Sequence, residues 1–303
     1  MKKQCLLILA ILLVSTNGFS QFKIYHPYWY RISVEPSVPV VKKIELETGV
    51  QLEYAEQGDP SQPAVVMMHG FTDSWKSYRS VLESLPPSVH AIAITMRGHG
   101  DSDHPVAGYE PALFSEDIAA LIQQLDLKPV LLVGHSFGGL VAQRVAIDHP
   151  GLLRGLILLG TTANFTVPEM KEFAGIVNSL QALPPDFAKE FQQSTLIRPI
   201  DTAWFQELVA ESMKMPLSTW KAILSGMVKA DLREELGQIK TTVRIIWGEQ
   251  DAYCVKGAQQ EMLRLIPDAT LATLPNSGHA VHWEEPGLVA DEIVQFLSQL
   301  THP

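Results

Sequence analysis

Six short runs of continuous apolar residues recur along this chain and alternate with segments of helical periodicity. Such runs are typical of strands that are covered on both faces, as in a parallel sheet. The runs lie at residues 64–68, 89–96, 130–133, 152–159, 243–247 and 269–274. The helical segments lie at residues 74–85, 111–125, 137–148, 255–266 and 286–300. This alternation predicts a doubly wound α/β sheet with helices on both faces.

Two further segments, 41–47 and 50–54, precede the first run and alternate apolar with polar residues around Thr48 and Gly49. Alternation of this kind around a glycine-containing turn is typical of an antiparallel hairpin. The hairpin and the six runs together predict a mostly parallel sheet of about eight strands.

One interval, residues 161–240, interrupts the alternation because it contains no convincing strand pattern. At about 80 residues it is much longer than a normal connection between two strands. It is helical in character and is broken by prolines, so we predict a helical cap inserted between the core segments 41–160 and 241–303. The strands on either side should both end near the active site, which places the cap over it. Its aromatic residues could form its own core, but we predict that Trp204 and Trp220 line a substrate pocket.

The chain begins with the pattern of a signal peptide in residues 1–20. Lys2 and Lys3 precede an apolar run at 5–14, and Gly18 and Ser20 are small residues at the expected cleavage site. The run is too short to cross a bilayer, which needs about 20 apolar residues. We therefore expect export to the periplasm or the medium and no stable membrane insertion after cleavage. An uncleaved N-terminal anchor or a buried N-terminal helix is the alternative.

Residues 21–40 are rich in aromatic residues and proline. We interpret this segment as an N-terminal arm packed on the domain, with a membrane-facing aromatic belt as the alternative. Cleavage would leave Cys254 as the only cysteine, so no disulfide within the chain is expected.

The overall charge argues against some classes of partner. The chain has 23 Lys and Arg against 33 Asp and Glu, which gives a formal net charge of −10 at pH 7. So acidic a chain is poorly suited to nucleic acid or to anionic lipid, both of which require Lys and Arg. The content of hydrophobic residues, 46%, is enough for a substantial core, and nothing in the composition requires a cofactor.

The strongest motif for chemistry is Gly-His-Ser-Phe-Gly at residues 134–138, which follows an apolar strand and precedes a helical segment. A serine in a tight strand-to-helix turn exposes its hydroxyl above the sheet edge, and the flanking glycines avoid collisions. The turn also places Ser136 at a helix N-terminus, where free N–H groups stabilise negative charge. We therefore predict that Ser136 is a nucleophile. The alternative is a glycine-rich turn with an incidental serine.

A serine nucleophile needs a histidine base that is held by a carboxylate. Among the ten histidines, His279 is the best candidate because it follows the last apolar run. Asp251 and Glu249 both follow the preceding run, so either could be the carboxylate. The order serine, carboxylate, histidine along the chain is that of an α/β hydrolase.

The negative oxygen formed during acyl transfer needs two hydrogen-bond donors. The backbone N–H of Phe137, directly after Ser136, is one candidate. The backbone N–H of Phe71 is the other, because Phe71 lies in the loop after the run 64–68. We interpret His69 in the same loop as a structural histidine bonded to nearby backbone.

The chain resembles the α/β-hydrolase fold family, in the branch with a helical cap that includes enol-lactonases, haloperoxidase-like esterases without a cofactor and carbon–carbon bond hydrolases. The resemblance covers about residues 41–300. The motifs that match are His69-Gly70-Phe71, the segments 97–102, 134–139 and 247–251, and Gly278-His279 through Glu285-Pro286.

The resemblance implies that Ser136 is the nucleophile, His279 the base and Asp251, rather than Glu249, the acid. It implies that the segment 97–102 is a structural turn held by its Arg and Asp residues. Dehalogenases and epoxide hydrolases of this fold carry aspartate in place of Ser136, which argues against both activities.

A metal site is an alternative interpretation of the neighbouring residues His99, Asp101, Asp103 and His104. We do not favour it, because a serine triad leaves no role for a metal. We therefore expect neither a metal nor a cofactor.

The favoured hypothesis is a serine hydrolase that cleaves a carboxylic ester or lactone through an acyl-enzyme. A small apolar substrate is expected, because the cap is rich in aromatic and Met residues and poor in basic clusters. The alternatives on the same triad are a carbon–carbon bond hydrolase, at which Trp283 hints, and a perhydrolase. An alternative of a different class is a ligand receptor without enzymatic activity on the same scaffold.

Overall fold

The computed structural model describes residues 38–300 of the 303-residue chain. The predicted signal peptide, residues 1–20, lies outside the described residues. So does the predicted arm, 21–40, apart from its last three residues.

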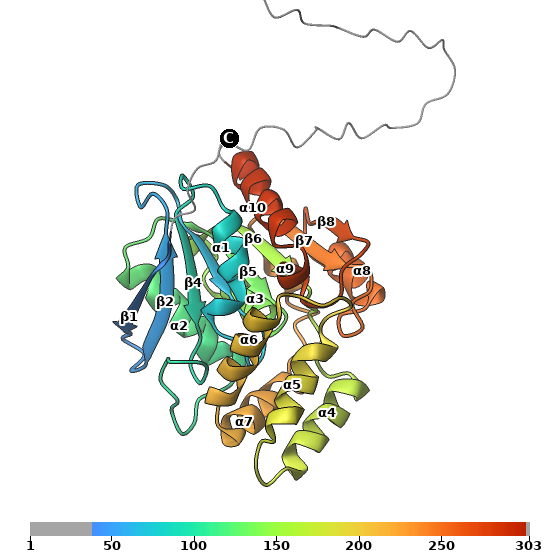
Figure 1. Ribbon diagram of the computed structural model, residues 1–303. Helices are drawn as coiled ribbons and strands as arrows, with labels where there is room; N and C mark the ends of the chain where they lie inside the picture. The colour runs from blue at the N-terminus through green and yellow to red at the C-terminus, as the bar shows by residue number, and fades with distance from the viewer. Residues whose placement is uncertain (1–37, 301–303) are drawn as a thin grey trace, which may run out of the picture. The chain divides into compact units, whose positions relative to one another are not determined.

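An eight-stranded sheet forms the centre of the described chain, as the alternation of apolar runs predicted (Figure 1). The first two strands and the β2–β4 pair are antiparallel, and all remaining neighbours are parallel, in the order β1-β2-β4-β3-β5-β6-β7-β8. The predicted fold class is therefore confirmed. The strands are β1 (Val40–Glu45), β2 (Gln51–Gln57), β3 (Val65–Met68), β4 (Ala91–Thr95), β5 (Val130–His135), β6 (Leu153–Leu159), β7 (Val243–Gly248) and β8 (Thr270–Leu274).

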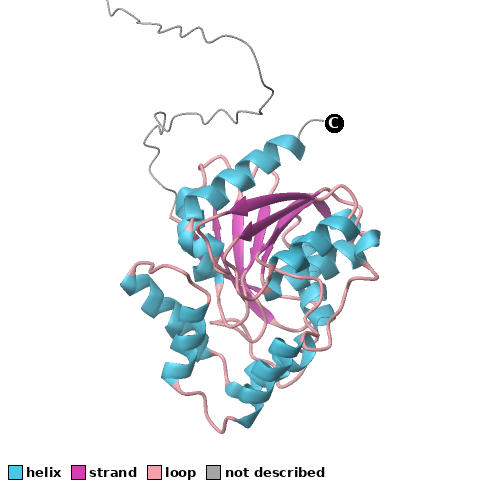
Figure 2. Cartoon of the chain, turned by 90° about the vertical axis from the view of Figure 1, so that its right-hand side faces the viewer, coloured by secondary structure: helices cyan, strands magenta, loops and turns pink. Residues whose placement is uncertain are grey.

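Helices cover both faces of the sheet, so two hydrophobic cores form, one on each side (Figure 2). One core includes apolar residues of α2 (Pro111–Gln124), α3 (Phe137–Asp148) and α8 (Lys256–Leu265). The other includes those of α1 (Arg79–Ser84) and α10 (Pro286–Leu300). The central strands β3, β4 and β5 are buried along their whole length, which is why their sequences are continuously apolar.

Two elements differ from the sequence prediction. The helix expected at 74–85 is divided into a 3-10 helix, η1 (Trp75–Tyr78), and α1, because Ser74 caps a separate first turn. Strand β8 is partly exposed, although its apolar run predicts a strand covered on both faces, because it lies at the sheet edge with β7 as its one neighbour. The remaining short elements are η2 (Pro150–Leu152) and α9 (Val281–Glu284).

The interval 161–240, which we call the insert, contains four α-helices, which gather below the sheet in Figure 1, and a short 3-10 helix. Prolines that interrupt its sequence begin these helices: Pro168 and Pro185 occupy first positions, and Pro216 precedes another helix. Proline fits the first turn because its missing N–H would have no partner there. The helices are α4 (Pro168–Ser179), α5 (Pro185–Ser194), α6 (Thr202–Lys214), α7 (Leu217–Met227) and η3 (Leu236–Gln238).

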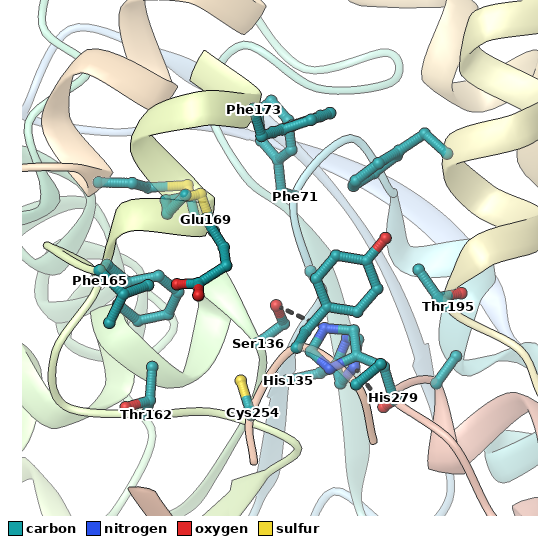
Figure 3. A pocket seen from close by; sticks show the side chains of 18 of the residues that line it. Phe71, His135, Ser136, Thr162, Phe165, Glu169, Phe173, Thr195, Cys254 and His279 are labelled. Carbon is teal, nitrogen blue, oxygen red and sulfur yellow. Dashed lines mark hydrogen bonds between the residues drawn. The ribbon is translucent and has the colours of Figure 1, made fainter. Parts of the chain in front are cut away.

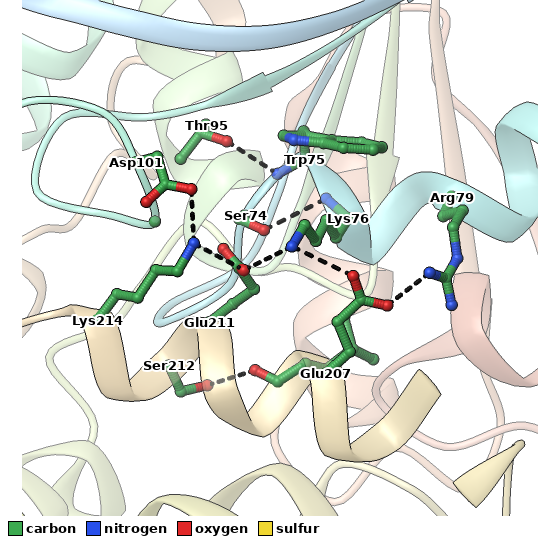
Figure 4. A network of polar contacts seen from close by, with 12 residues as sticks. Ser74, Trp75, Lys76, Arg79, Thr95, Asp101, Glu207, Glu211, Ser212 and Lys214 are labelled. Atoms are coloured by element: carbon green, nitrogen blue, oxygen red, sulfur yellow. Dashed lines mark hydrogen bonds and ion pairs between the residues drawn. The ribbon is translucent and has the colours of Figure 1, made fainter. Parts of the chain in front are cut away.

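A chain of ion pairs joins α6 of the insert to the core (Figure 4). Glu211 is buried between two lysines, Lys76 of η1 and Lys214, whose Nζ atoms lie 2.8 and 3.0 Å from its Oε1. The pairs are Lys76–Glu207, Lys76–Glu211, Arg79–Glu207, Lys214–Glu211 and Lys214–Asp101. The network therefore holds the insert beside the segment that follows β3.

The segment 97–102 is a turn held by hydrogen bonds. The guanidinium of Arg97 donates two hydrogen bonds to the carboxylate of Asp117 on α2, at 2.5 and 2.6 Å, and a third to the carbonyl of Gly108. Both charged groups are buried, so the pair fixes the turn against α2.

Within residues 38–300, no helix is both long enough and apolar enough to cross a bilayer.

Candidate active site

Three loops at the carboxyl ends of parallel strands bring the predicted residues together. Ser136 follows β5, Asp251 follows β7 and His279 follows β8. The carboxyl ends of parallel strands lie along one edge of a sheet, so residues far apart in the sequence meet there. Ser136 and His279 face one another at the floor of a cavity (Figure 3).

The backbone at Ser136 is held in a strained conformation, with φ 51° and ψ −115°. A residue with a Cβ adopts a positive φ at a cost, and the surrounding structure must enforce it. Gly134 and Gly138 make this possible, because a Cβ at Gly134 would collide with the Gly138 carbonyl and one at Gly138 with the His69 carbonyl. The hydroxyl of Thr161 also donates a hydrogen bond to the Ser136 carbonyl at 2.7 Å.

His279 links the other two side chains. Its Nε2 lies 2.9 Å from Oγ of Ser136, and its Nδ1 lies 2.9 Å from Oδ2 of Asp251. When the neutral ring carries its proton on Nδ1, Nδ1 donates to the carboxylate and Nε2 accepts from the hydroxyl. This arrangement can therefore take a proton from Ser136 while the adjacent carboxylate stabilises the positive ring.

The carboxylate of Asp251 is kept ionised by its neighbours. Burial alone would raise the pKa of Asp251, but the nearby His279 ring and two backbone N–H groups hold the pKa below its ordinary value. Those N–H groups belong to Tyr253 and Cys254 and donate to Oδ1 at 2.7 and 2.9 Å. Glu249, the rival in the sequence, is exposed, and the His279 ring makes its hydrogen bond to Asp251 instead.

The backbone N–H groups of Phe71 and Phe137 are available as donors. Within residues 38–300 neither group donates a hydrogen bond to the protein. Phe137 is the first residue of α3, so its N–H lies at the positive end of the helix. Because Gly138 packs directly on the carbonyls of Met68 and His69, the first turn of α3 lies beside the loop that contains Phe71. Such a pair of donors suits a developing negative oxygen.

Four further histidines lie buried around the site and are held in the neutral form. His69 bonds to backbone on both sides, with Nδ1 2.7 Å from the Gly70 carbonyl and Nε2 accepting from the Met96 N–H at 3.0 Å. Burial lowers the pKa of His69 to about 4 and that of His135 to about 3. Burial also lowers the pKa of His99 and of His282 well below the ordinary value.

One buried carboxyl, that of Asp73, has a pKa that is raised rather than lowered. Burial raises the pKa of Asp73 to about 7, although a hydrogen bond from Gln192 and the His279 ring act against the increase. Asp73 lies in the loop after β3 and forms part of the cavity wall.

A cavity of about 360 Å³ opens above Ser136, between the strand ends and the insert (Figure 3). A volume of this order holds a small organic molecule. Its walls are mostly apolar side chains of α4, α5 and α7 together with the loops after β3, β7 and β8. The large apolar residues among them are Phe71, Phe165, Val167, Met170, Phe173, Phe191, Leu224, Met227, Tyr253, Val255 and Trp283.

The prediction that Trp204 and Trp220 line this cavity is wrong. Trp220 is fully buried behind the wall, where its ring contacts those of Phe71 and Phe191 at centroid distances of 5.1 and 5.8 Å. Trp204 packs against Trp283 with a centroid distance of 6.3 Å. Phe71, Phe191 and Trp283 line the cavity, whereas Trp204 and Trp220 lie behind them and do not.

Sequence reasoning missed the residues of the insert that do form the wall. Glu169, Met170 and Phe173 line the cavity from α4, and Phe165 lines it from the loop before this helix. On the helix, Phe173 follows Glu169 by four residues and Met170 by three, spacings that place side chains on one helix face and were the available signal. The sequence could not indicate whether that face turns toward the sheet or toward the other insert helices.

The metal interpretation of the segment 99–104 has no support in the positions of its side chains. Asp101 pairs with Lys214, and Nδ1 of His99 lies 2.8 Å from the Arg97 carbonyl. Asp103 accepts a hydrogen bond from the Gln51 N–H. Among residues 38–300, the groups of side chains close enough to share an ion are Asp73 with His135 and His282, and Asp251 with Cys254 and His279.

Comparisons with known proteins agree with this geometry. The sequence profile described as alpha/beta hydrolase family matches residues 65–292. The sn-1-specific diacylglycerol lipase ABHD11 of Mus musculus is 26% identical over 80% of this chain and 83% of its own length. The 2-(acetamidomethylene)succinate hydrolase of Mesorhizobium japonicum is 25% identical over 82% of this chain and 92% of its own length. An esterase structure from Exiguobacterium antarcticum superposes with a TM-score of 0.79, with 23% identity over 86% of this chain and all of the esterase, and shows the fold alone.

The buried neutral histidines predict that acid destabilises the fold. Between pH 6.5 and about 4 the unfolded chain gains protons that folded His69, His99, His135 and His282 do not accept, so the free energy of unfolding falls as the pH falls. Each histidine contributes a slope of up to about 1.4 kcal/mol per pH unit. Asp73 acts in the opposite direction over the same window, because its folded carboxyl retains a proton that the unfolded chain loses.

Denaturant titrations at pH values from 7 to 4.5 measure this slope. The wild-type free energy should decrease with decreasing pH, and His282→Phe, which removes one of the four rings, should make the decrease shallower. A free energy that is flat or increases toward pH 4.5 would contradict the prediction.

Proposed function

The chain belongs to the alpha/beta hydrolase family, and from this membership we propose that it is a serine hydrolase that cleaves a small, apolar carboxylic ester or lactone through an acyl-enzyme. The observation that carries the proposal is the hydrogen-bonded chain from Ser136 through His279 to Asp251. The cavity above Ser136 supplies the space for the substrate.

Acylation begins when Oγ of Ser136 attacks the carbonyl carbon and transfers its proton to Nε2 of His279. The negative charge that develops on the carbonyl oxygen is stabilised by the N–H groups of Phe71 and Phe137. Asp251 stabilises the protonated ring through Nδ1. Collapse of the tetrahedral intermediate breaks the bond to the alkoxy oxygen, which takes the proton from Nε2 and leaves as an alcohol.

Deacylation repeats these steps with water in place of the hydroxyl. A water molecule gives a proton to Nε2 of His279 and attacks the acyl carbon, and the acid leaves as Ser136 recovers the proton. With a lactone the alcohol stays attached to the acyl group, so one ring-opened hydroxy acid is the product.

The walls of the cavity favour an uncharged substrate. Most of its lining is apolar, and among the described lining residues the ionisable carboxyls are Asp73 and Glu169 while none is Lys or Arg. A substrate carboxylate would lose its hydration there without gaining a cationic partner. The cavity therefore suits acyl esters of the kind named for the mouse lipase better than the succinate derivative named for the Mesorhizobium enzyme.

Three alternatives remain as predictions on the same residues: a carbon–carbon bond hydrolase, a perhydrolase and a receptor without activity. Trp283, the residue that suggested a carbon–carbon bond hydrolase, lines the cavity, so this alternative retains its one specific observation. A receptor without activity would bind ligand in the same cavity but would not turn over an ester. Burst kinetics with a chromogenic ester distinguish the receptor from an enzyme.

We further propose that the protein acts outside the cytoplasm. The support is the signal-peptide pattern of residues 1–20. N-terminal sequencing of the exported protein should find Gln21 as the first residue, whereas an intact Met1 on a cytoplasmic protein would overturn the proposal.

The nucleophile is tested by labelling with a fluorophosphonate. The reagent should attach to Ser136, and Ser136→Ala should lose both the label and roughly 10³-fold or more of kcat while retaining its melting temperature. An adduct on another residue of an active protein would refute the assignment.

The carboxylate is tested by a matched pair of variants. Asp251→Asn should lower kcat on the order of 10⁴-fold, by analogy with other triads, because the amide cannot stabilise the protonated ring. Glu249→Gln removes the same charge two residues away and should leave kcat nearly unchanged. The reverse result would assign the role to Glu249.

Glu169 on α4 predicts discrimination against anionic substrates. Its carboxylate points into the cavity in Figure 3, and no cation pairs with it among the described residues. An ester with a terminal carboxylate should have a kcat/KM roughly 10-fold below that of its uncharged methyl-ester analogue, because like charges repel in the cavity. Glu169→Gln should bring the kcat/KM values of the two esters closer together, and Glu169→Lys should make the ester with the carboxylate the better substrate. An unchanged ratio in both variants would remove Glu169 from substrate selection.

A further inference from the structure

One short segment of the insert, residues 192–198, forms hydrogen bonds with two of the loops that carry the proposed catalytic groups, or with a residue that is itself bonded to such a loop. This segment includes the end of α5 and the start of the connection to α6. One of the two loops follows β3 and contains Phe71, and the other follows β8 and contains His279. Neither loop has regular secondary structure of its own at these residues.

The first contact is made by Gln192, which is 1% exposed. Its side-chain Nε2 lies 2.8 Å from Oδ1 of Asp73 and 3.1 Å from Oγ1 of Thr72. It also lies 2.7 Å from Oγ of Ser212 on α6, so the amide stands between two insert helices and the loop. A buried carboxyl such as Asp73 needs a donor, and Gln192 supplies it.

The loop after β3 needs an external contact because its backbone is strained. Thr72, directly after Phe71, has a φ of 71°, which is unfavourable for a β-branched residue. A strained conformation persists when the surrounding structure over-determines it. The Asp73 N–H donates to the Gly70 carbonyl at 3.3 Å, which belongs to the same peptide group as the Phe71 N–H. By holding Thr72 and Asp73, the hydrogen bonds from Gln192 therefore help to fix this peptide group.

The second contact is made by the backbone of Thr195. Its carbonyl accepts hydrogen bonds from the N–H groups of His279 and Ala280, at 3.0 and 3.1 Å. The backbone N–H of the proposed base is thus bonded to the insert, while its carbonyl lies 3.1 Å from Nε2 of His135 at the end of β5.

The third contact is made by Glu284, at the end of α9. Its Oε1 accepts from the N–H groups of Ile197 and Arg198 at 2.7 and 3.2 Å, and its Oε2 accepts from the Gly278 N–H at 2.6 Å. One carboxylate therefore ties the insert to the residue before His279. The guanidinium of Arg198 adds a hydrogen bond to the Glu284 carbonyl.

We propose that the segment 192–198 aligns the loop of Phe71 with the loop of His279, and that Gln192 and Glu284 are positioning residues for the reaction. The inference rests on the proposed function, because it assigns these contacts a role in acyl transfer. The insert then completes the active site instead of acting as a lid that opens and closes. Lifting the segment would break the contacts of Gln192, Thr195 and Glu284 together and would release both loops.

The size of the expected effect follows from geometry. The oxyanion donor and the base act at the same acyl carbon from two separate loops, and a misplacement of about 1 Å can cost on the order of 100-fold in rate. The effect should fall on kcat, since the apolar walls that bind the substrate stay in place.

The first test is Gln192→Met, which keeps the length and bulk of the side chain and removes the amide donor. We expect kcat to fall by roughly 10- to 100-fold with KM changed by less than about threefold. The inhibition constant of a trifluoromethyl ketone, whose adduct carries a negative oxygen, should rise in parallel with the loss in kcat/KM. A merely structural role would not move this constant in proportion.

The second test is Glu284→Gln, which keeps the shape but replaces one acceptor oxygen by an NH₂ group that cannot accept a hydrogen bond, so either the insert or Gly278 loses its acceptor. The rate at which a fluorophosphonate labels Ser136 should fall by roughly 10-fold or more, because His279 must be in place to take the proton. This variant also decides the proposal if Gln192→Met does not fold.

Ile223→Ala provides the control for stability. Ile223 is fully buried on α7 and does not line the cavity, so its truncation should lower the melting temperature without changing kcat or the labelling rate. The proposal is overturned if the two positioning variants keep wild-type kcat and labelling rates, or if Ile223→Ala loses as much activity as they do. Ser136→Ala distinguishes failure of the proposed function from failure of the alignment proposal. If this variant still hydrolyses esters, the proposed function is refuted. If it loses hydrolysis while Gln192→Met and Glu284→Gln keep wild-type rates, only the alignment proposal is refuted.

Discussion

The close packing of the first turn of α3 on the end of β3 is the constraint on which the rest of the site depends. It is possible because Gly138 has no side chain where the carbonyls of Met68 and His69 approach. This contact forces Ser136 into its strained backbone conformation and brings the N–H of Phe137 beside the loop that contains Phe71. The residues that we propose as nucleophile and oxyanion donors are therefore placed by backbone packing and not by the rotamers of their side chains.

Burial around this turn has electrostatic consequences. The site is surrounded by histidines whose pKa values are lowered by burial and by one carboxyl, Asp73, whose pKa is raised. The neighbouring histidines are neutral, and the ionised carboxylate of Asp251 makes the direct contact with the His279 ring. The same low-dielectric surroundings that make an unpaired charge costly strengthen the interaction between Asp251 and the protonated ring.

Much of the fold and of the candidate site could be predicted because the relevant signals are local. Continuous apolar runs report burial on both faces, and the glycines around Ser136 report a turn that admits no side chain. The order of Ser136, Asp251 and His279 then places three residues at the ends of strands, where a parallel sheet collects them. The motifs alone left Asp251 and Glu249 as alternatives, and the resemblance favoured Asp251. Both carboxylates follow the same strand, and the sequence does not show which of them points toward His279.

The sequence by itself determined the sheet, the insert and the residues brought to the strand ends, because each follows from a periodicity or a motif within one segment. Only the tertiary structure decided which faces of the insert helices turn toward the sheet. Trp204 and Trp220 lie behind other aromatic residues, while Phe165, Met170 and Phe173 form the wall. The contacts of Gln192, Thr195 and Glu284 were equally invisible in the sequence. Those that reach from the insert to the two loops and to α9 join residues 84 to 120 positions apart, and such pairings depend on how helices dock rather than on any local pattern.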